Sequence, residues 1–407
     1  MRWQENRALP PCVAALMAAL AEPGAGSGFP PFSDAEWDRA LHYFDRQQLT
    51  LLLPRAGLPA KALQRLERNA SDNRERIRRL EQAFLEIQGA IRTPFLALKG
   101  FANWERFTPD PYARVQYDLD LFCPETAEQA RDALLALGYE SAPGGEKFPT
   151  DHLPRLVRKT GWQWRGDFFD PEIPLSVELH FRLWDEETEG FPAPGIENFW
   201  SRRVEQKLGG ATYQALHPAD ALGYSALHLL RHLLRGDVRG ANVHEIAWFL
   251  ETQASNDAFW TTWRDLHGAE LRRLQAVCFR LAAAWFDCRM HPIARVEAEA
   301  LGRRIRQWFE QFAASPAESL FRPNKDELWL HLCLLDSFRK KAAVLRRRLL
   351  PARLPGPLDV IFIPEKQMTP ALRIRKQWEY ARYAAGRAWF HLRALAPTLS
   401  RMLRTRF

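Results

Sequence analysis

Cysteine is scarce in this chain, and its arrangement excludes two classes of protein. There are five cysteines in 407 residues, an odd number, and no two of them form a Cys-x-x-Cys pair. A disulfide framework is built from an even set of cysteines, and a cysteine zinc site is built from closely spaced pairs. We therefore expect reduced thiols and a reducing compartment. The cysteines are Cys12, Cys123, Cys278, Cys288 and Cys333.

Long apolar runs are also missing. A membrane-spanning helix needs about 20 consecutive apolar residues, and no stretch of this sequence approaches that length. Residues 1–7 lack the basic-then-apolar order of a secretory signal. The sequence therefore predicts a soluble, cytoplasmic protein.

Acidic residues are rare near the C-terminal end, although not in the chain as a whole. The formal net charge is +8. Residues 339–407 contain 17 Lys or Arg against 3 Asp or Glu, a net of +14. The other 338 residues therefore contain 40 basic and 46 acidic residues, a net of −6. The basicity belongs to the C-terminal segment and indicates little about the rest of the protein.

Hydrophobic and helix-forming sequence is abundant. Hydrophobic residues make up 46% of the chain and charged residues 26%, which are values of a globular protein. The length favours two or three structural units. We predict an α+β fold, in which a small mixed β-sheet lies between helical N- and C-terminal regions. The predicted units are a helical region at 1–90, a core at 91–205, a helical domain at 206–350, and a Pro-rich link with a basic amphipathic helix at 351–407.

Capping signals and apolar periodicity set the predicted helix boundaries. Ser33-Asp-Ala-Glu36 is a capping box, which predicts a helix to about Gln48. Apolar residues recur at helical intervals over about 60–90, which predicts one long helix. Residues 206–300 are expected to be helical. The helices predicted after the core run from Asp220 as N-cap to Leu234, from Asn242 as N-cap to Thr252, over about 271–286, and over 371 to about 395.

Residues 91–205 have a different pattern, which is typical of short strands. The apolar run 94–98 stops at Lys-Gly, as a buried strand entering a turn would. Residues 117–122 and 174–181 alternate polar and apolar, the period of a strand. Residues 127–137 are predicted to be a helix closed by Gly138. This order predicts a small α/β or α+β unit.

The feature most indicative of chemistry is Asp118-Leu-Asp120 on a predicted strand. Alternation places both carboxylates on one face, where they repel each other. A divalent cation offsets that repulsion, and Mg²⁺ favours a few carboxylates together with water and phosphate. Glu178, on another predicted strand, is a candidate third ligand, and His180 would share its face.

Upstream residues suit phosphate binding. Lys99-Gly100 ends a strand and precedes a helical segment, so Gly100 permits close backbone approach and Lys99 adds positive charge. Arg114, shortly before the Asp pair, is a further candidate for contact with phosphate. Each of these residues has a plainer interpretation: Lys99 as a surface lysine, Arg114 in a surface ion pair, and Asp-x-Asp as a solvated strand edge.

Together these motifs resemble those of a bacterial family of nucleotidyltransferases with the polymerase-beta-type fold. Leu-Lys-Gly, an Arg before Asp-x-Asp-Leu, a Gly-Tyr pair and Glu-Leu-His appear in the same order. The clear match covers about 95–184, and a looser one covers the helical part around His228 and His232. The chain departs from the wider superfamily in having Lys-Gly where Gly-Ser or Gly-Gly is usual. The matching residues are Leu98, Lys99, Gly100, Arg114, Asp118, Asp120, Gly138, Tyr139, Glu178, Leu179 and His180.

The resemblance implies a reaction and a ligand set. Asp118, Asp120 and Glu178 would bind Mg²⁺, or Mn²⁺, and Lys99 and Gly100 would bind the triphosphate, with Arg114 and His180 nearby. A nucleoside monophosphate would pass from an NTP, most often ATP, to an acceptor, with release of pyrophosphate. The acceptor is left open among a peptide natural product, a sugar, a small molecule and a protein.

Two further features have a choice of interpretation. His228 and His232 share a helix face, where we favour packing over a metal site or a place in the cleft. Aromatic and basic residues interleave over 373–393, where we favour an aromatic stripe packed on the domain over binding to a membrane surface or nucleic acid. The rival functions are therefore a nucleic-acid- or membrane-binding protein that uses the basic C-terminus and a non-catalytic nucleotide-binding relative.

Overall fold

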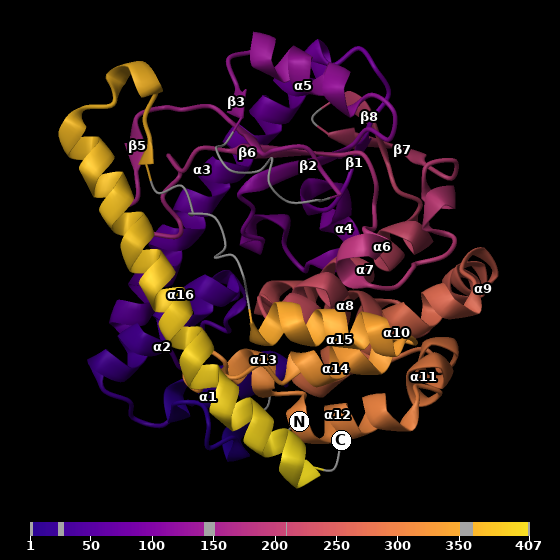
Figure 1. Ribbon diagram of the computed structural model, residues 1–407. Coiled ribbons are helices and arrows are strands. Elements are labelled where there is room, and N and C mark those ends of the chain that lie inside the picture. The colour runs from indigo at the N-terminus through magenta and orange to yellow at the C-terminus, as the bar shows by residue number, and fades with distance from the viewer. Residues whose placement is uncertain (1–2, 23–27, 142–150, 209, 351–360, 406–407) are drawn as a thin grey trace.

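The computed structural model describes residues 3–22, 28–141, 151–208, 210–350 and 361–405 (Figure 1). It confirms the α+β class: a seven-stranded mixed sheet has helices before and after it in the chain. Figure 1 shows the sheet and α5 above a layer of helices, with α16 running along one side of the molecule. Most of the predicted proline-rich link, residues 351–360, lies outside the described residues.

The N-terminal helices form where the sequence predicts them. Ser33 and Glu36 make both bonds of the capping box: the Ser33 side chain accepts from the Glu36 N–H, and Glu36 accepts from the Ser33 N–H at 2.8 Å. The long helix α3 packs on the sheet through Phe84, whose ring contacts Phe101 and Tyr213. The helices are α1 Pro11–Ala21, α2 Asp34–Gln47 and α3 Ala60–Ala90, with the 3₁₀ turns η1 Trp3–Glu5 and η2 Thr50–Leu52.

The sheet has the strand order β3-β4-β6-β2-β1-β8-β7. β2 and β6 are parallel neighbours at its centre, and β1 lies antiparallel to β2 on the other side. The helical turn after β1 consists of η3 Gly100–Asn103 and α4 Trp104–Phe107, and α5 Ala127–Ala136 follows β2. The strands are β1 Leu96–Ala97, β2 Asp118–Phe122, β3 Glu140–Ser141, β4 Leu156–Val157, β6 Ser176–His180, β7 Val204–Leu208 and β8 Ala211–Ala215; β5 Trp162–Gln163 pairs with β9 Ile361–Phe362 in a separate sheet.

The expectation that residues 206–300 are entirely helical is wrong at its start. Residues 204–215 form the hairpin β7–β8, and β8 extends the sheet by pairing parallel to β1, with Ala97 opposite Ala215. The sequence signal was present, because a Gly-Gly pair separates two short alternating segments. These segments are half polar and therefore lack the apolar run that identifies a central strand.

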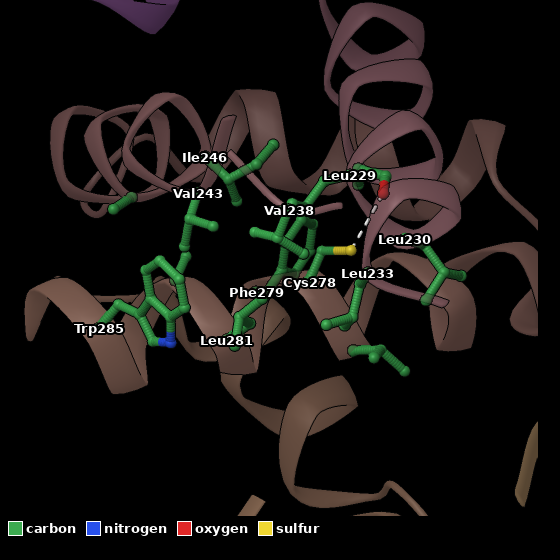
Figure 2. Close-up of a cluster of buried hydrophobic side chains, with 14 of the residues drawn as sticks. Leu229, Leu230, Leu233, Val238, Val243, Ile246, Cys278, Phe279, Leu281 and Trp285 are labelled. Carbon is green, nitrogen blue, oxygen red and sulfur yellow. Dashed lines mark hydrogen bonds between the residues drawn. The ribbon is translucent and has the colours of Figure 1, made fainter. Parts of the chain in front are cut away.

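The helices after the sheet share one core. Figure 2 shows side chains of α7 and α8, among them Leu229 and Val243, packed against Phe279 and Trp285 of α10. Cys278 lies in this core and donates its thiol to the Ala226 carbonyl at 3.0 Å. The helices are α7 Pro218–Arg235, α8 Gly240–Thr252, α9 Asp257–Leu266, α10 Ala269–Phe286, α11 Pro292–Glu299, α12 Arg303–Phe312, α13 Ser315–Glu318, α14 Glu327–Leu334 and α15 Phe338–Leu349; the short turns are η4 Pro111–Ala113, α6 Glu186–Glu189, η6 Ile196–Phe199 and η7 Glu365–Gln367.

Two predicted N-caps in this region are wrong. α7 is capped by the side chain of His217, while Asp220 lies inside the first turn and bonds Arg202 and His267. α8 begins at Gly240, so Asn242 also lies inside its helix. Asp220 therefore pairs with Arg202 and His267 instead of capping the start of α7.

The last helix, α16 Pro370–Thr405, is longer than predicted and lies differently on the molecule. Trp378 and Trp389 are exposed by 67% and 62%, so the favoured expectation of a packed aromatic stripe is wrong for them. The helix is instead held through other positions, including the buried Ala394 and Thr398. None of the described helices is both long enough and apolar enough to cross a membrane.

Candidate active site

Two neighbouring strands place the predicted carboxylates together. β2 and β6 run parallel, with Asp118 opposite Ser176 and Asp120 opposite Glu178. Residues two apart on a strand share a face. Asp118, Asp120 and Glu178 therefore lie on one face of the sheet, and all three line the same cavity.

The tightest group in this cluster contains a histidine. Ligand atoms of Asp120, Glu178 and His180 all lie within 4.8 Å of one another, and His180 Nε2 is 3.1 Å from Asp120 Oδ1. Asp118 lies beside this group but is not part of it. The structure thus contains a compact cluster in which His180 lies beside two of the three predicted metal ligands, Asp120 and Glu178.

His180 is held rigidly behind the carboxylates. It is fully buried, and its Nδ1 lies 3.4 Å from Asp151 Oδ2, which in turn forms an ion pair with Arg231. Burial alone would lower the pKa of His180, but contact with Asp120 and Asp151 raises it to about 9. The imidazole is therefore protonated at neutral pH and bridges two buried carboxylates.

Lys99 meets the cluster from the end of β1. Its Nζ lies 3.0 Å from Asp120 Oδ1 and 3.0 Å from His228 Nε2. Burial alone would lower the pKa of Lys99, but Asp120 and the neighbouring acids raise it above its ordinary value. Burial also opposes ionisation of Asp120, yet Lys99 and His180 lower the pKa of that carboxyl below its usual range.

Asp118 has the opposite electrostatic character. Burial and the adjacent negative charge of Asp120 raise the pKa of Asp118 to about 6. The pKa values of these two carboxyls on one strand face therefore shift in opposite directions, because Asp120 has two close cationic partners and Asp118 has none as close. A raised pKa from crowding with like charge is typical of functional sites.

Gly100 and Arg114 complete this wall of the cavity. Gly100 has φ +62, and a Cβ atom there would lie 2.2 Å from Gln116 Nε2. Gln116 is fixed in that position because it donates to the Asp118 carbonyl at 2.7 Å. Arg114 lines the cavity, and its Nε donates to Glu245 Oε1 at 2.7 Å, so its charge is already paired.

The two histidines of α7 line the cavity rather than only packing within the bundle. His228 Nε2 lies 3.1 Å from His232 Nε2 as well as next to Lys99. Burial and the charge of Lys99 lower the pKa of His228 well below its ordinary value, so it is neutral. The less favoured interpretation, a place in the cleft, is therefore the one that the structure shows.

The cavity is large and has two unlike ends. Its volume is about 1320 Å³, which exceeds the roughly 300–1,000 Å³ of a typical small-molecule site. One end holds the carboxylates and Lys99. The other end is built from helices α14 to α16 and the segments around them. Its lining includes Lys325, Arg347, Arg348, Leu350, Arg387 and Phe390.

Sequence reasoning missed several residues of this site. Asp151 lies in a stretch with no recognisable motif, and only folding brings it beside His180. Arg231 carried a usable signal, because it lies three positions after His228 and therefore on an adjacent face of the helix. Arg239 lines the cavity from the N-cap of α8 and had no signal of its own.

Comparison with known proteins identifies one family. Residues 33–287 match the model of a family described as uncharacterised nucleotidyltransferase, which is more than half of the chain. The matched region begins at α2, contains the whole seven-stranded sheet and ends just after α10. No curated protein and no solved structure matches the chain.

Proposed function

The chain belongs to this family of nucleotidyltransferases, and from that premise we propose that it transfers a nucleoside monophosphate from an NTP to an acceptor. The observation that carries the proposal is the register of β2 and β6, which sets Asp120 beside Glu178 and close to Lys99 at the wall of a cavity. ATP is the proposed donor, and pyrophosphate is the proposed leaving group.

Asp118, Asp120 and Glu178 would hold Mg²⁺, or Mn²⁺ in its place. The residues fit such an ion because carboxylate oxygens are its preferred ligands and because the three carboxylates lie on one face of the sheet, where a cation offsets their mutual repulsion. When bound, the ion would supply a Lewis acid that stabilises charge on the transferred phosphoryl group. His180 is buried outside the cavity lining, so we propose that it positions Asp120 instead of touching the nucleotide.

Lys99 and Gly100 would receive the triphosphate. Lys99 Nζ lies 3.0 Å from Asp120 Oδ1 and on the cavity wall, so it can meet a phosphate oxygen there. Gly100 lies on the same cavity wall, and the Gln116 side chain packs against its backbone where a Cβ would otherwise be. Arg114 would contribute a weaker field, because Glu245 already neutralises it.

The reaction needs little covalent help from the protein. An acceptor oxygen attacks the α-phosphorus, the bond from that phosphorus to the bridging oxygen of the β-phosphate breaks, and pyrophosphate leaves with the bond electrons. A hydroxyl acceptor also loses its proton to a site carboxylate or to water, whereas an ionised phosphate acceptor has none to lose. Positioning and charge stabilisation supply most of the catalysis in such transfers.

The far end of the cavity would hold the acceptor. Glu189 and Glu327 at that end are each bonded to an arginine. Lys325, Arg347 and Arg387 also line it, and none of these three forms an ion pair within the part of the chain that the structure describes. Three cations without a paired acid favour an acceptor that carries negative charge, either phosphate or carboxylate.

The test is pyrophosphate release and product mass. The protein is incubated with Mg²⁺, ATP and a panel of hydroxyl, carboxylate and phosphate compounds, beside Asp120→Asn and the exposed control Asp132→Asn. We expect pyrophosphate and a product heavier by one nucleoside monophosphate. The rate at which both form should fall roughly a hundredfold or more in Asp120→Asn and should not fall in the control. Metal-dependent ATP binding without any turnover would instead favour the non-catalytic relative.

A further inference from the structure

The outer face of α16 carries a stripe of large apolar side chains in contact with solvent. We call these six residues the α16 stripe, and their exposed fractions run from 41% to 81%. Soluble proteins rarely leave a contiguous apolar surface without a use. The α16 stripe consists of Ile374, Trp378, Trp389, Leu392, Leu399 and Leu403.

The helical repeat places these residues in one line. At 3.6 residues per turn, the six positions fall within an arc of about 80°, over a length of about 44 Å. Alanines at 381, 385 and 396 occupy the intervening positions of the same face and are exposed as well. The stripe is therefore continuous along almost the whole helix, which Figure 1 shows at the edge of the molecule.

The helix is attached to the protein by its opposite face. Thr398 is fully buried and its hydroxyl accepts from the Lys325 N–H at 2.9 Å, Ala394 is fully buried, and Arg401 forms an ion pair with Asp326. His391 lies 2.7 Å from the Lys325 ammonium. These contacts fix which side of α16 faces inward, so the exposure of the stripe follows from how the helix is docked. Leu392 belongs to the stripe and is 62% exposed, but it also lines the cavity.

The charged residues of α16 indicate which kind of partner the α16 stripe would contact. Residues 370–405 contain eight Lys or Arg and a single acid, Glu379. Arg375, Arg382 and Arg393 lie about 60–80° from the centre of the stripe, so they form a basic row along one flank. A helix with aliphatic and Trp residues on one face and basic residues beside them is typical of a membrane interface.

We propose that α16 lies flat on an anionic lipid surface, with its stripe among the headgroups and upper acyl chains and its arginines on lipid phosphates. A second copy of the chain is a poorer partner, because an antiparallel pair of α16 helices would bring the same basic rows together. Nucleic acid is a poorer partner too, because Ile374, Leu392 and Leu403 offer nothing to phosphates. The proposal does not depend on nucleotidyl transfer.

Vesicle flotation of the full chain tests the proposal. We expect binding to phosphatidylcholine vesicles that contain phosphatidylglycerol, weaker binding at high salt, and little binding to phosphatidylcholine alone. Leu392→Glu/Leu403→Glu should weaken binding roughly tenfold or more, whereas Leu135→Glu on the exposed side of α5 should not. Arg382→Ser/Arg393→Ser should weaken it roughly thirtyfold.

The depth of the α16 tryptophans in the lipid layer is measured separately by fluorescence quenching. Brominated lipids should quench tryptophan emission in the wild-type chain, and Trp378→Phe/Trp389→Phe should remove most of that quenching while vesicle binding is largely retained. Absence of flotation with anionic vesicles, or equal flotation of the Leu392→Glu/Leu403→Glu chain, overturns the proposal. Binding to RNA without vesicles, or a dimer dispersed by the Leu→Glu changes without vesicle binding, also overturns it and identifies the partner instead.

Discussion

At the scale of single residues, the site is organised around Asp120. Lys99 and His180 each lie about 3 Å from its Oδ1, and both are cationic. Asp120 is therefore kept ionised inside a buried site, while burial and the charge of Asp120 raise the pKa of Asp118 on the same strand to about 6. The alternation of residues 117–122 was enough to predict the shared face, because residues two apart on a strand point to the same side whatever the tertiary structure. Asp151 was not predictable, because its role exists only through His180.

Gly100→Ala tests how closely the backbone near Lys99 is fitted. The left-handed φ of +62 costs a side chain about 1–2 kcal/mol, and the new Cβ would collide with the Gln116 amide. We expect a lower free energy of unfolding and weaker Mg-ATP binding. Gly100→Ala/Gln116→Ala should recover only part of the loss, because the backbone strain remains.

The matched control is Gly89→Ala. Gly89 lies on α3 with nothing within 4 Å of a new Cβ, so alanine there should stabilise by about 0.5–1 kcal/mol. Urea unfolding of the wild type and the three variants measures both effects. A Gly100→Ala chain as stable as the wild type would mean that the turn after β1 is not fixed as described.

At the scale of elements, sequence patterns succeeded where local physics decides and failed where tertiary contacts decide. The capping box and apolar period placed α2 and α3 within a residue or two of their bounds. The hairpin β7–β8 was missed because its segments are half polar and gain their place by pairing with β1. The packing of α16 was also mispredicted. Helical periodicity shows which residues share a face, but it does not show whether that face points toward the protein or toward solvent.

The buried acid of α7 gives a test at this scale. Asp220 accepts from Arg202 at 2.9 Å and 2.7 Å and lies 3.0 Å from His267 Nε2, which ties the start of α7 to the segment before β7 and to the end of α9. Burial alone would raise the pKa of Asp220, but His267 and Arg202 lower it below its ordinary value. A lowered folded-state pKa means that the stabilisation is present above the unfolded pKa, about 3.9, and is lost as pH falls through the folded value.

Asp220→Asn should therefore lower the free energy of unfolding by about 3–5 kcal/mol at pH 7, because Arg202 loses its buried partner. It should also reduce the decline in stability between about pH 5 and pH 3. Denaturant melts across that range measure both quantities, with the exposed Asp132→Asn as a control expected within about 0.5 kcal/mol of the wild type. An unchanged pH profile would show that Asp220 is not ionised in the folded protein.

At the scale of the whole molecule, the cavity joins parts of the chain that are far apart in sequence. The sheet supplies the carboxylates and Lys99, α7 supplies His228 and Arg231, and the segments after residue 325 supply the basic far end. The family match ends at residue 287, so the basic wall lies outside it. We infer that the matched region carries the nucleotide chemistry and that the C-terminal helices set the choice of acceptor.

The measurement that tests the central claim most directly is calorimetric titration with each of the four ribonucleoside triphosphates, with and without Mg²⁺. The wild type is compared with Asp118→Asn/Asp120→Asn and with the surface control Asp132→Asn. We predict Mg²⁺-dependent binding of an NTP, with ATP preferred, in the wild type and the control, and its loss in the double variant. Metal-independent binding that the double variant retains, or no binding of any triphosphate, would contradict it.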